Sequence, residues 1–473
     1  MYLKSKTLCG ITCILYKYMT QDIKKIILLI GDIAIFYASL WLGLSLRRLE
    51  LVYTDVLINH IPAFSVVLIF WIIVFYINDL YLVSRSRNAS ERMNSIITSM
   101  LINTALAAVF FYVTQNIWSI KPQTILILSS LIFTILLYMY RAIMERFYGS
   151  TTFHNGVLFV GINEISNELI TYIKNNNQLG YSVKAIIDET AKDNNSIPTY
   201  NVNDSVFNTV LNKHDIQTVV ISLHIYENPK ITSSLYNVLN PNIRIVNLPR
   251  FYEEVTGKIP VNQIGQAWVL ENFASETKRM FDVIKRFFDI IISLILGFFS
   301  ILLLPFVALV IILDSGFPIF FKQTRVGYMG KKFLAIKYRS MKQDAEKHGA
   351  QWAQKNDSRV TRVGKFLRKS RIDELPQLWN ILKGDMSLIG SRPERPVFVE
   401  ELTKEIPFYK ERLLIKPGLS GWAQVMGPAY GGSKEETLEK LQYDLYYLKN
   451  RSLGLDLAIT LKTIKTIVSR KGQ

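Results

Sequence analysis

The sequence predicts a membrane protein of three parts: a membrane α-helical N-terminal bundle with four spans, an α/β domain, and an α+β domain that carries a re-entrant membrane helix. Three observations predict this. Four apolar stretches precede residue 145, alternating strand and helix patterns follow, and a charge-free run between basic clusters comes next. The predicted boundaries are 1–147 for the bundle, 148–272 for the α/β domain and 278–473 for the last domain, with its re-entrant helix at 286–313.

Composition places the protein among membrane proteins. Hydrophobic residues make up 49% of 473 residues, and the formal net charge is +17. Most of the basic excess lies after residue 277, where 34 Lys and Arg face 19 Asp and Glu. Beside long apolar segments, this excess indicates anionic lipid or a phosphorylated substrate rather than nucleic acid. Cys9 and Cys13 are the only cysteines, which excludes a disulfide framework and a multi-cysteine metal site.

Each of the four N-terminal apolar stretches is near the 17–25 residues that a spanning helix needs. They are Ile26–Leu46, Ile61–Ile77, Ile96–Thr114 and Thr124–Tyr140. Lys and Arg gather in the tail before the first stretch, in the second loop and after the fourth stretch. The positive-inside rule therefore predicts that both ends of the bundle are cytoplasmic. Asp32 lies within the first stretch, either as a functional acid or as a side chain that reaches the membrane interface.

The segment from about Phe153 to Val269 alternates strands with helices, which predicts a small parallel Rossmann-like domain. The first strand, Gly156–Gly161, ends in a loop that lacks the second and third glycines of a dinucleotide fingerprint. A structural or regulatory use is favoured over nucleotide binding. Tyr226 and Lys230 have the spacing of a dehydratase motif, but Pro229 disfavours the helix that the motif requires.

The run Ile290–Leu313 has no charged residue and contains Pro305. Its length suits a membrane helix, yet basic residues on both flanks favour the cytoplasm. They are Lys278, Arg279, Lys285 and Arg286 before the run, and Lys322, Arg325, Lys331 and Lys332 after it. A helix that bends at Pro305 and returns to the side it entered satisfies both flanks.

An acidic pair, Asp373 and Glu374, lies in a basic segment further along. Leu375, Leu378, Trp379 and Leu382 follow at the spacing of one apolar helix face, so a short helix is predicted to begin near Asp373. The pair could be an N-cap and a first-turn acid. It could also be functional, because a helix N-terminus suits an anion and nearby cations keep an aspartate ionised and nucleophilic.

Five segments in this region closely resemble the bacterial sugar transferase family, the monotopic phosphoglycosyl transferases. They are Phe320–Gly327, Ile336–Met341, Arg371–Gly390, Arg392–Glu394 and Lys416–Val425. The resemblance covers about residues 278–473. The preceding spans and Rossmann-like domain resemble the long form of the family, the undecaprenyl-phosphate hexose-1-phosphate transferases that start exopolysaccharide, capsule and O-antigen repeat units.

The resemblance implies a two-step exchange. Asp373 attacks the sugar-bearing phosphorus of a UDP-hexose (UDP-glucose or UDP-galactose), releases UMP and forms an aspartyl-phosphosugar. Undecaprenyl phosphate then attacks this intermediate. Glu374 is implied to assist the acceptor or to hold Mg²⁺ together with Asp373, since carboxylates suit this ion. The implied phosphate-binding and substrate-binding residues are Lys337, Arg339, Arg368, Arg392, Gln323, Arg325 and Lys416.

Two departures from the family pattern stand out. Ser391 replaces the proline of the usual Gly-Pro-Arg-Pro-Glu, and Leu304 replaces the serine that commonly precedes the proline of the membrane helix. The first loosens a turn but keeps Arg392. The second leaves the carbonyls freed by Pro305 without a hydroxyl partner. The tail Leu441–Val468 mixes Tyr, Lys and aliphatic residues, which suits either helices in the headgroup layer or a packed core.

The expected location is the bacterial inner membrane, as a multi-pass protein whose catalytic domain faces the cytoplasm. Expected partners are UDP-hexose, undecaprenyl phosphate, the lipid bilayer and downstream glycosyltransferases; nucleic acid is not expected and a homodimer stays open. Three alternatives remain: an N-acetylhexosamine-1-phosphate transferase, a non-catalytic membrane scaffold for polysaccharide assembly, and a membrane-anchored nucleotide-sugar dehydratase with bound NAD.

Overall fold

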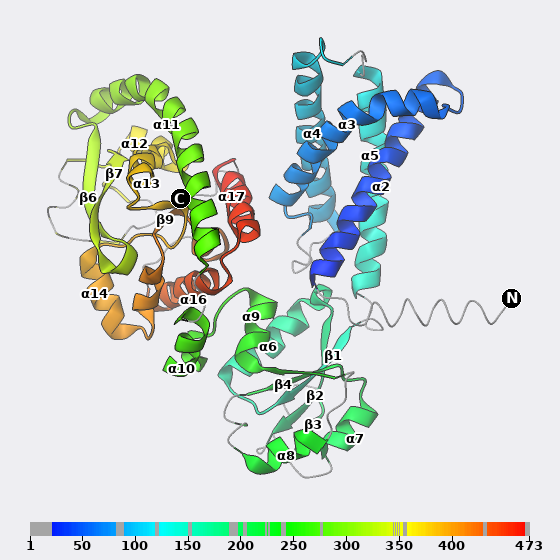
Figure 1. Cartoon of the computed structure of the whole chain (residues 1–473), viewed down its shortest axis with the longest axis vertical. Coiled ribbons are helices and arrows are strands. Elements are labelled where there is room, and N and C mark those ends of the chain that lie inside the picture. The colour runs from blue at the N-terminus through cyan, green and yellow to red at the C-terminus, as the bar shows by residue number, and fades with distance from the viewer. Residues whose placement is uncertain are drawn as a thin grey trace. The chain divides into compact units, whose positions relative to one another are not determined.

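The computed structural model describes residues 21–468 except 82–88, 119–122, 150–153, 189–196, 202–205, 223–224, 226–227, 238–242, 275–277, 344, 346, 348, 350, 353–356 and 429–432. Tyr226, Cys9 and Cys13 therefore lie outside the described residues. The chain divides into two compact units, Met1–Phe251 and Tyr252–Gln473 (Figure 1).

The first unit begins with four long helices, as the sequence predicts. They are α2 (Gln21–Arg48), α3 (Thr54–Ile77), α4 (Ala89–Val113) and α5 (Gln123–Gly149). All four are long and apolar enough to cross a membrane. Their shared core is aromatic, with Phe36, Trp71 and Phe133 in mutual edge contacts. The bundle is therefore held by side-chain packing between helices.

Asp32 is fully buried in this bundle and does not reach an edge. Its Oδ2 accepts a hydrogen bond of 2.5 Å from Arg141 of α5. A charge pair shielded from solvent needs such a partner. The pair links the first and last helices, a role that local sequence around either residue does not reveal.

A five-stranded parallel sheet of order β3-β2-β1-β4-β5 completes the first unit, which confirms the predicted Rossmann-like architecture. Its strands are β1 (Asn155–Val160), β2 (Tyr181–Asp188), β3 (Thr199–Asn201), β4 (Thr218–Ile221) and β5 (Arg244–Asn247). The helices between them are α6 (Glu164–Asn175), α7 (Val206–Lys213) and α8 (Pro229–Asn237), and α9 (Leu248–Thr256) follows β5.

Backbone N–H groups of the loop after β1 are hydrogen-bonded to nearby side chains. Asn163 and Ser166 form a capping box at the start of α6, and Asp188 accepts a hydrogen bond from the Ile162 N–H at 3.2 Å. In a dinucleotide site such N–H groups face the pyrophosphate. These contacts favour the structural interpretation of this loop.

The second unit starts earlier than predicted. Residues 252–272, assigned to the Rossmann-like domain from sequence, pack instead on the following domain. Ile259 and Val261 enter its core, Lys258 pairs with Glu439 at 2.6 Å, and Glu253 accepts from Lys449 at 2.6 Å. The sequence boundary differs because these contacts join residues more than 150 positions apart. The segment comprises η4 (Val261–Gln263), α10 (Gln266–Val269) and η5 (Leu270–Ala274).

The rest of the second unit consists of a long helix, α11 (Arg279–Ser315), together with a hairpin, short helices and a small parallel pair (Figure 1). The hairpin is β6 (Phe320–Val326) and β7 (Lys332–Tyr338), and the parallel pair is β8 (Ser387–Ile389) and β9 (Gly418–Ser420). The helical elements are α12 (Arg362–Lys369), η7 (Ile372–Gln377), α13 (Leu378–Lys383), α14 (Pro396–Glu405), η8 (Tyr409–Leu414), α15 (Trp422–Met426), α16 (Lys434–Asn450) and α17 (Leu453–Val468).

Helix α11 is bent in Figure 1, and its two ends fold back on the same domain. Near its start, Arg286 donates to the carbonyls of Ile381 and Leu382 at 2.5 and 2.7 Å. Near its end, Val307 and Ile311 pack with Tyr338 and Leu367. At 37 residues a straight α-helix would be about 55 Å long, far more than the roughly 30 Å of a bilayer core.

The central part of α11 carries many large apolar side chains that are exposed. They include Leu294, Phe298, Phe299, Ile301, Leu302, Phe306 and Leu309. Exposed apolar surface of this extent marks contact with lipid or another hydrophobic partner. The helix thus has two anchored ends on one polar domain and a bare apolar middle.

Candidate active site

The acidic pair lies on η7, a 3-10 turn between α12 and α13. Arg371 precedes it with a left-handed φ of 58°, which turns the chain so that Asp373 and Glu374 point inward, each only 6% exposed. Asp373 is not the N-cap considered from sequence, because Arg371 holds that position and makes no side-chain cap. The predicted single helix is thus a 3-10 turn followed by the short α13.

This change of helix type alters the predicted apolar face. Leu378 is buried as expected, but Trp379 is 63% exposed and Ile381 is buried in its place. A 3-10 turn has 3.0 residues per turn rather than 3.6, so the spacing counted from Leu375 loses phase. Of the residues predicted to share one apolar face, Trp379 is the one that is exposed.

Glu374 is the centre of a cationic cluster. Its Oε1 accepts from Lys337 Nζ at 2.7 Å and from Arg392 at 2.9 Å, and Arg371 lies 3.9 Å from its Oε2. Burial alone would raise the pKa of Glu374, but Lys337, Arg392 and Arg371 together hold it below its ordinary value. Glu374 is therefore an anion that organises three cations from three separate segments.

Asp373 is held differently. Its Oδ1 is buried and has no hydrogen-bond partner. Burial, and then the charge of Glu374, raise the pKa of Asp373 to about 6, against the opposing charges of Lys337, Arg368 and Arg371. A carboxylate with an unused oxygen and a pKa close to neutrality is suited to react rather than to form a structural ion pair.

The other predicted residues divide into three groups. Lys337, Arg368 and Arg392 all lie close enough to Asp373 to act on its charge. Arg325 and Gln323 form a neighbouring layer, where Arg325 donates to Gln323 at 2.5 Å and to the carbonyl of Pro393 at 2.9 Å.

Arg339 and Lys416 lie elsewhere. Arg339 donates to the carbonyls of Ser315 and Phe317, each at 2.7 Å, at the end of α11. Lys416 lies among the charges of Arg286 and Asp289. The structure thus places Arg339 at the end of α11 and Lys416 near its start.

Sequence reasoning missed three residues that support the site. Arg371 was noted only as a nearby charge, whereas it provides the left-handed turn. Arg412 and Asp444 form a buried ion pair at 2.8 Å, and Arg412 also donates to the backbone carbonyl of Arg392. Nothing local in the sequence signals this pair, since Arg412 is 20 positions from Arg392 and 32 from Asp444.

Asp373 is the residue of this site that could bind a divalent cation. Among the residues that the structure describes, no group of three or more His, Cys, Asp or Glu side chains is arranged to hold a metal. Mg²⁺ is commonly bound by one or two carboxylates together with substrate phosphates and water. The unpartnered Oδ1 of Asp373 suits that role, whereas Oε1 of Glu374 is already taken by two cations.

The chain matches two family models. The model described as bacterial sugar transferase matches residues 280–470, and one described as a CoA-binding domain matches residues 76–249. The first covers the whole cluster around Asp373. The second includes the parallel sheet.

Three relatives extend the comparison. A UDP-glucose:undecaprenyl-phosphate glucose-1-phosphate transferase of Xanthomonas campestris is 31% identical, covering 67% of each chain. A UDP-N-acetylgalactosamine-undecaprenyl-phosphate N-acetylgalactosaminephosphotransferase of Aeromonas hydrophila is 44% identical over 49% of this chain and 54% of its own. Galactosyl transferase CpsE of Streptococcus agalactiae is 28% identical over 86% of this chain and 93% of its own.

The fold, the acidic pair with its cations and these matches define a membrane-associated transferase. The chain belongs to the bacterial sugar transferase family. The predicted family is thereby confirmed, and the predicted enzyme class agrees with the names of these relatives.

Proposed function

We propose that this protein transfers a sugar 1-phosphate from a UDP-sugar to undecaprenyl phosphate, with Asp373 as the nucleophile. The observation that carries the proposal is the contrast within the acidic pair: Glu374 is fully engaged by cations, whereas Asp373 keeps a buried oxygen free. A non-catalytic scaffold would not require such an oxygen, because a buried carboxylate oxygen without a hydrogen-bond partner lowers the stability of the folded protein.

In the first step an oxygen of Asp373 attacks the phosphorus that bears the sugar. A bond forms between that oxygen and phosphorus, and the bond to the bridging oxygen breaks, so that UMP leaves with the electron pair. In the second step a phosphate oxygen of undecaprenyl phosphate attacks the same phosphorus and expels the Asp373 carboxylate. One phosphoanhydride replaces another, so no further energy source is required.

The cations around Glu374 stabilise the negative charge on the oxygens of the phosphate during transfer. Arg392 can keep its bond to Glu374 and present its remaining N–H groups to phosphate oxygens, a match that its planar fork favours. Arg368 donates through Nε to Ser340 at 2.9 Å and lies close enough to Asp373 to act on its charge, so its terminal N–H groups are candidates for contacts to the donor phosphates. Mg²⁺, when bound at Asp373, would neutralise the diphosphate.

The donor sugar has two candidates. A hexose was predicted from sequence, and the name of the Aeromonas relative, 44% identical, favours N-acetylhexosamine. The deciding experiment is a panel of UDP-glucose, UDP-galactose and UDP-N-acetylhexosamines with purified protein in nanodiscs and undecaprenyl phosphate, scored by UMP. One donor should exceed the rest by at least about tenfold. The absence of acceptor-dependent UMP with every donor would refute the proposed transfer.

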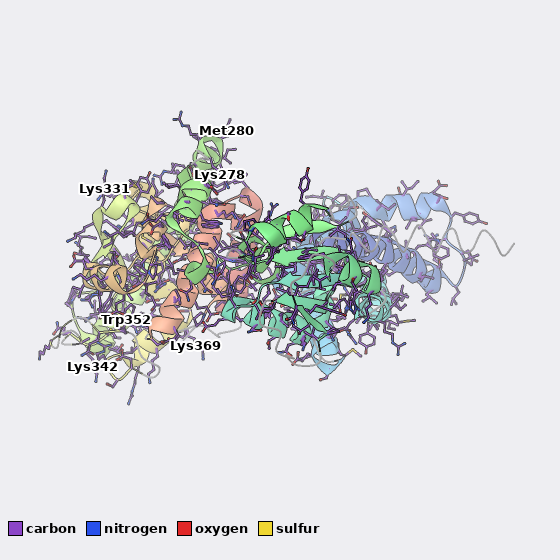
Figure 2. All side chains as sticks on the ribbon, turned by 90° about the horizontal axis from the view of Figure 1, so that it is seen from below. Lys278, Met280, Lys331, Lys342, Trp352 and Lys369 are labelled. Carbon is purple, nitrogen blue, oxygen red and sulfur yellow. The ribbon has the colours of Figure 1, made fainter. Side chains whose placement is uncertain are left out.

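We also infer that α11 enters the inner leaflet and returns to the cytoplasmic side. Support comes from its two anchored ends on one polar domain and the apolar middle between them. With Cys9 and Cys13 replaced by serine, Met280→Cys and Lys322→Cys should both react with an impermeant maleimide only in inverted vesicles. Figure 2 shows Met280 at the outer edge of the second unit, where the reagent can reach it.

Leu49→Cys serves as the control for the opposite face, since Leu49 is 89% exposed in the loop after the first helix. It should react from outside intact cells. Labelling of Met280→Cys and Lys322→Cys from opposite faces would show that α11 spans the membrane and would remove the geometric basis of the site.

The pKa of Asp373 sets a pH dependence. Its pKa is raised to about 6 by burial and by the charge of Glu374, and only the carboxylate can attack phosphorus. The UMP burst measured in single turnover should therefore fall about tenfold for each pH unit below about 6. Circular dichroism at each pH checks that the fold persists. A rate that stays constant down to pH 4.5 would contradict this assignment.

A further inference from the structure

The backbone that carries Arg392 is held at four consecutive carbonyls. Ser391 accepts from the Gly418 N–H at 2.8 Å, and Glu394 accepts from the Val326 N–H at 2.9 Å. Between them, Arg392 and Pro393 each accept from an arginine side chain at 2.9 Å. Bonds at every position of a loop fix its course and so the direction of the side chains on it.

The arginine that bonds to the carbonyl of Arg392 is Arg412 of η8. Its terminal nitrogens reach three acceptors: the carbonyl of Arg392 at 2.9 Å, Asp444 of α16 at 2.8 Å and the hydroxyl of Tyr409 at 2.7 Å. Arg412 and Asp444 are both buried. A planar fork with several donors can hold these acceptors together, whereas a lysine ammonium is a point charge on a flexible stem.

Ser391 provides a further bond between the loop and Arg412. Its hydroxyl donates to the carbonyl of Arg412 at 3.1 Å, so that side chain and backbone of Arg412 are both tied to the loop. A proline, the usual family residue at this position, restricts the backbone but has no hydroxyl. In this chain a hydrogen bond therefore takes over part of the restraint that a proline ring would give.

We propose that Arg412, held by Asp444 and Ser391, is a positioning residue that fixes Arg392 against Glu374. The route is continuous: Asp444 bonds Arg412, Arg412 bonds the carbonyl of Arg392, and the side chain of Arg392 bonds Glu374 at 2.9 Å. Positioning of a charged group to within about half an ångström governs how well it stabilises a transition state. This inference rests on the proposed transfer, because Arg392 acts there on the donor phosphates.

The competing explanation is that the Arg412–Asp444 pair only joins η8 to α16 within the core. Both elements pack in one hydrophobic cluster that includes Tyr409, Leu441 and Leu445. A purely structural pair would change stability, and its effect on catalysis would be the same whether or not Arg392 is present. A positioning pair would lose its effect once the Arg392 side chain is removed.

The test is a double-mutant cycle on kcat/KM for UMP release, using the full chain in nanodiscs. Arg412→Lys should lower kcat/KM about tenfold in the parent and less than about twofold in an Arg392→Ala background, because the two changes act through one group. Arg451→Lys is the matched control, since Arg451 pairs with Asp282 at 3.0 Å in another part of the unit, and it should leave kcat/KM unchanged in both backgrounds.

An equal fall in both backgrounds, or an Arg392→Ala variant as active as the parent, would overturn the proposal. If Arg412→Lys does not fold, Ser391→Ala enters the same cycle with the same criterion, because it removes one hydroxyl from the loop. Asp373→Asn is measured in parallel. Turnover in that variant would refute the proposed role of Asp373 as the nucleophile. If Asp373→Asn is inactive and Arg412→Lys lowers kcat/KM equally in both backgrounds, only the positioning role is refuted.

Discussion

Asp373→Asn is expected to abolish UMP release, with a fall of at least about a thousandfold, the scale seen when a covalent nucleophile is removed. The amide has nearly the same shape but cannot attack phosphorus. With donor and no undecaprenyl phosphate, the parent should gain a sugar-phosphate adduct visible by intact mass, and labelled UMP should exchange into the UDP-sugar. The variant should show neither.

The stability of this variant separates lost chemistry from lost folding. Because the pKa of Asp373 is raised in the folded protein, its ionised form is disfavoured there at neutral pH. A neutral amide removes that unfavourable contribution, so the melting temperature of Asp373→Asn should equal or exceed that of the parent. If the variant is inactive and also melts well below the parent, misfolding would explain the loss of activity. Unchanged UMP release would rule out Asp373 as the nucleophile.

The sequence is informative about features that depend on neighbouring residues. Asp373 and Glu374 are adjacent, and the charge-free run of α11 is visible from composition alone. Each depends on neighbours within one element, which is the information that periodicity and charge patterning contain. The parallel sheet of the first unit was predictable for the same reason.

Residues that act through distant partners were not predictable. Asp32 and Arg141 are 109 positions apart, and only the packing of α2 against α5 brings them together. Arg412 and Asp444 have ordinary local surroundings, and their importance comes from a backbone carbonyl that no pattern marks. The start of the second unit at Tyr252 has the same origin, since Glu253 finds its partners on α16.

Phase within short helices was the other source of error. One α-helix was predicted to begin near Asp373 and to carry Trp379 on its apolar face, but the chain first forms a 3-10 turn around Pro376, and Trp379 is exposed. The same turn removes Asp373 from the cap position and leaves its Oδ1 unpartnered. A local irregularity that the sequence did not reveal therefore accounts for the unpartnered oxygen on which the proposed role of Asp373 rests.

Glu374→Gln should change the activity in two separable ways. The rate of UMP release should fall about 100-fold, because Lys337 and Arg392 lose the carboxylate that organises them near the transferring phosphate. At the same time the acid limb of the pH profile should move to lower pH, toward the ordinary aspartate range near 4. The charge of Glu374 raises the pKa of Asp373, so its removal lowers that pKa, and the freed cations lower it further.

The shift in the pH profile distinguishes this expectation from general damage to the site, which would lower the rate without moving the limb. Glu253→Gln provides the matched control, because Glu253 is also buried and accepts from Lys449 and Asn450 at 2.6 Å each. The Glu253→Gln variant should release UMP at the rate of the parent, and the acid limb of its pH profile should lie at the same pH. An acid limb that stays near 6 in Glu374→Gln would show that Glu374 does not set the pKa of Asp373, and a limb that moves to higher pH would reverse the electrostatic assignment of the pair.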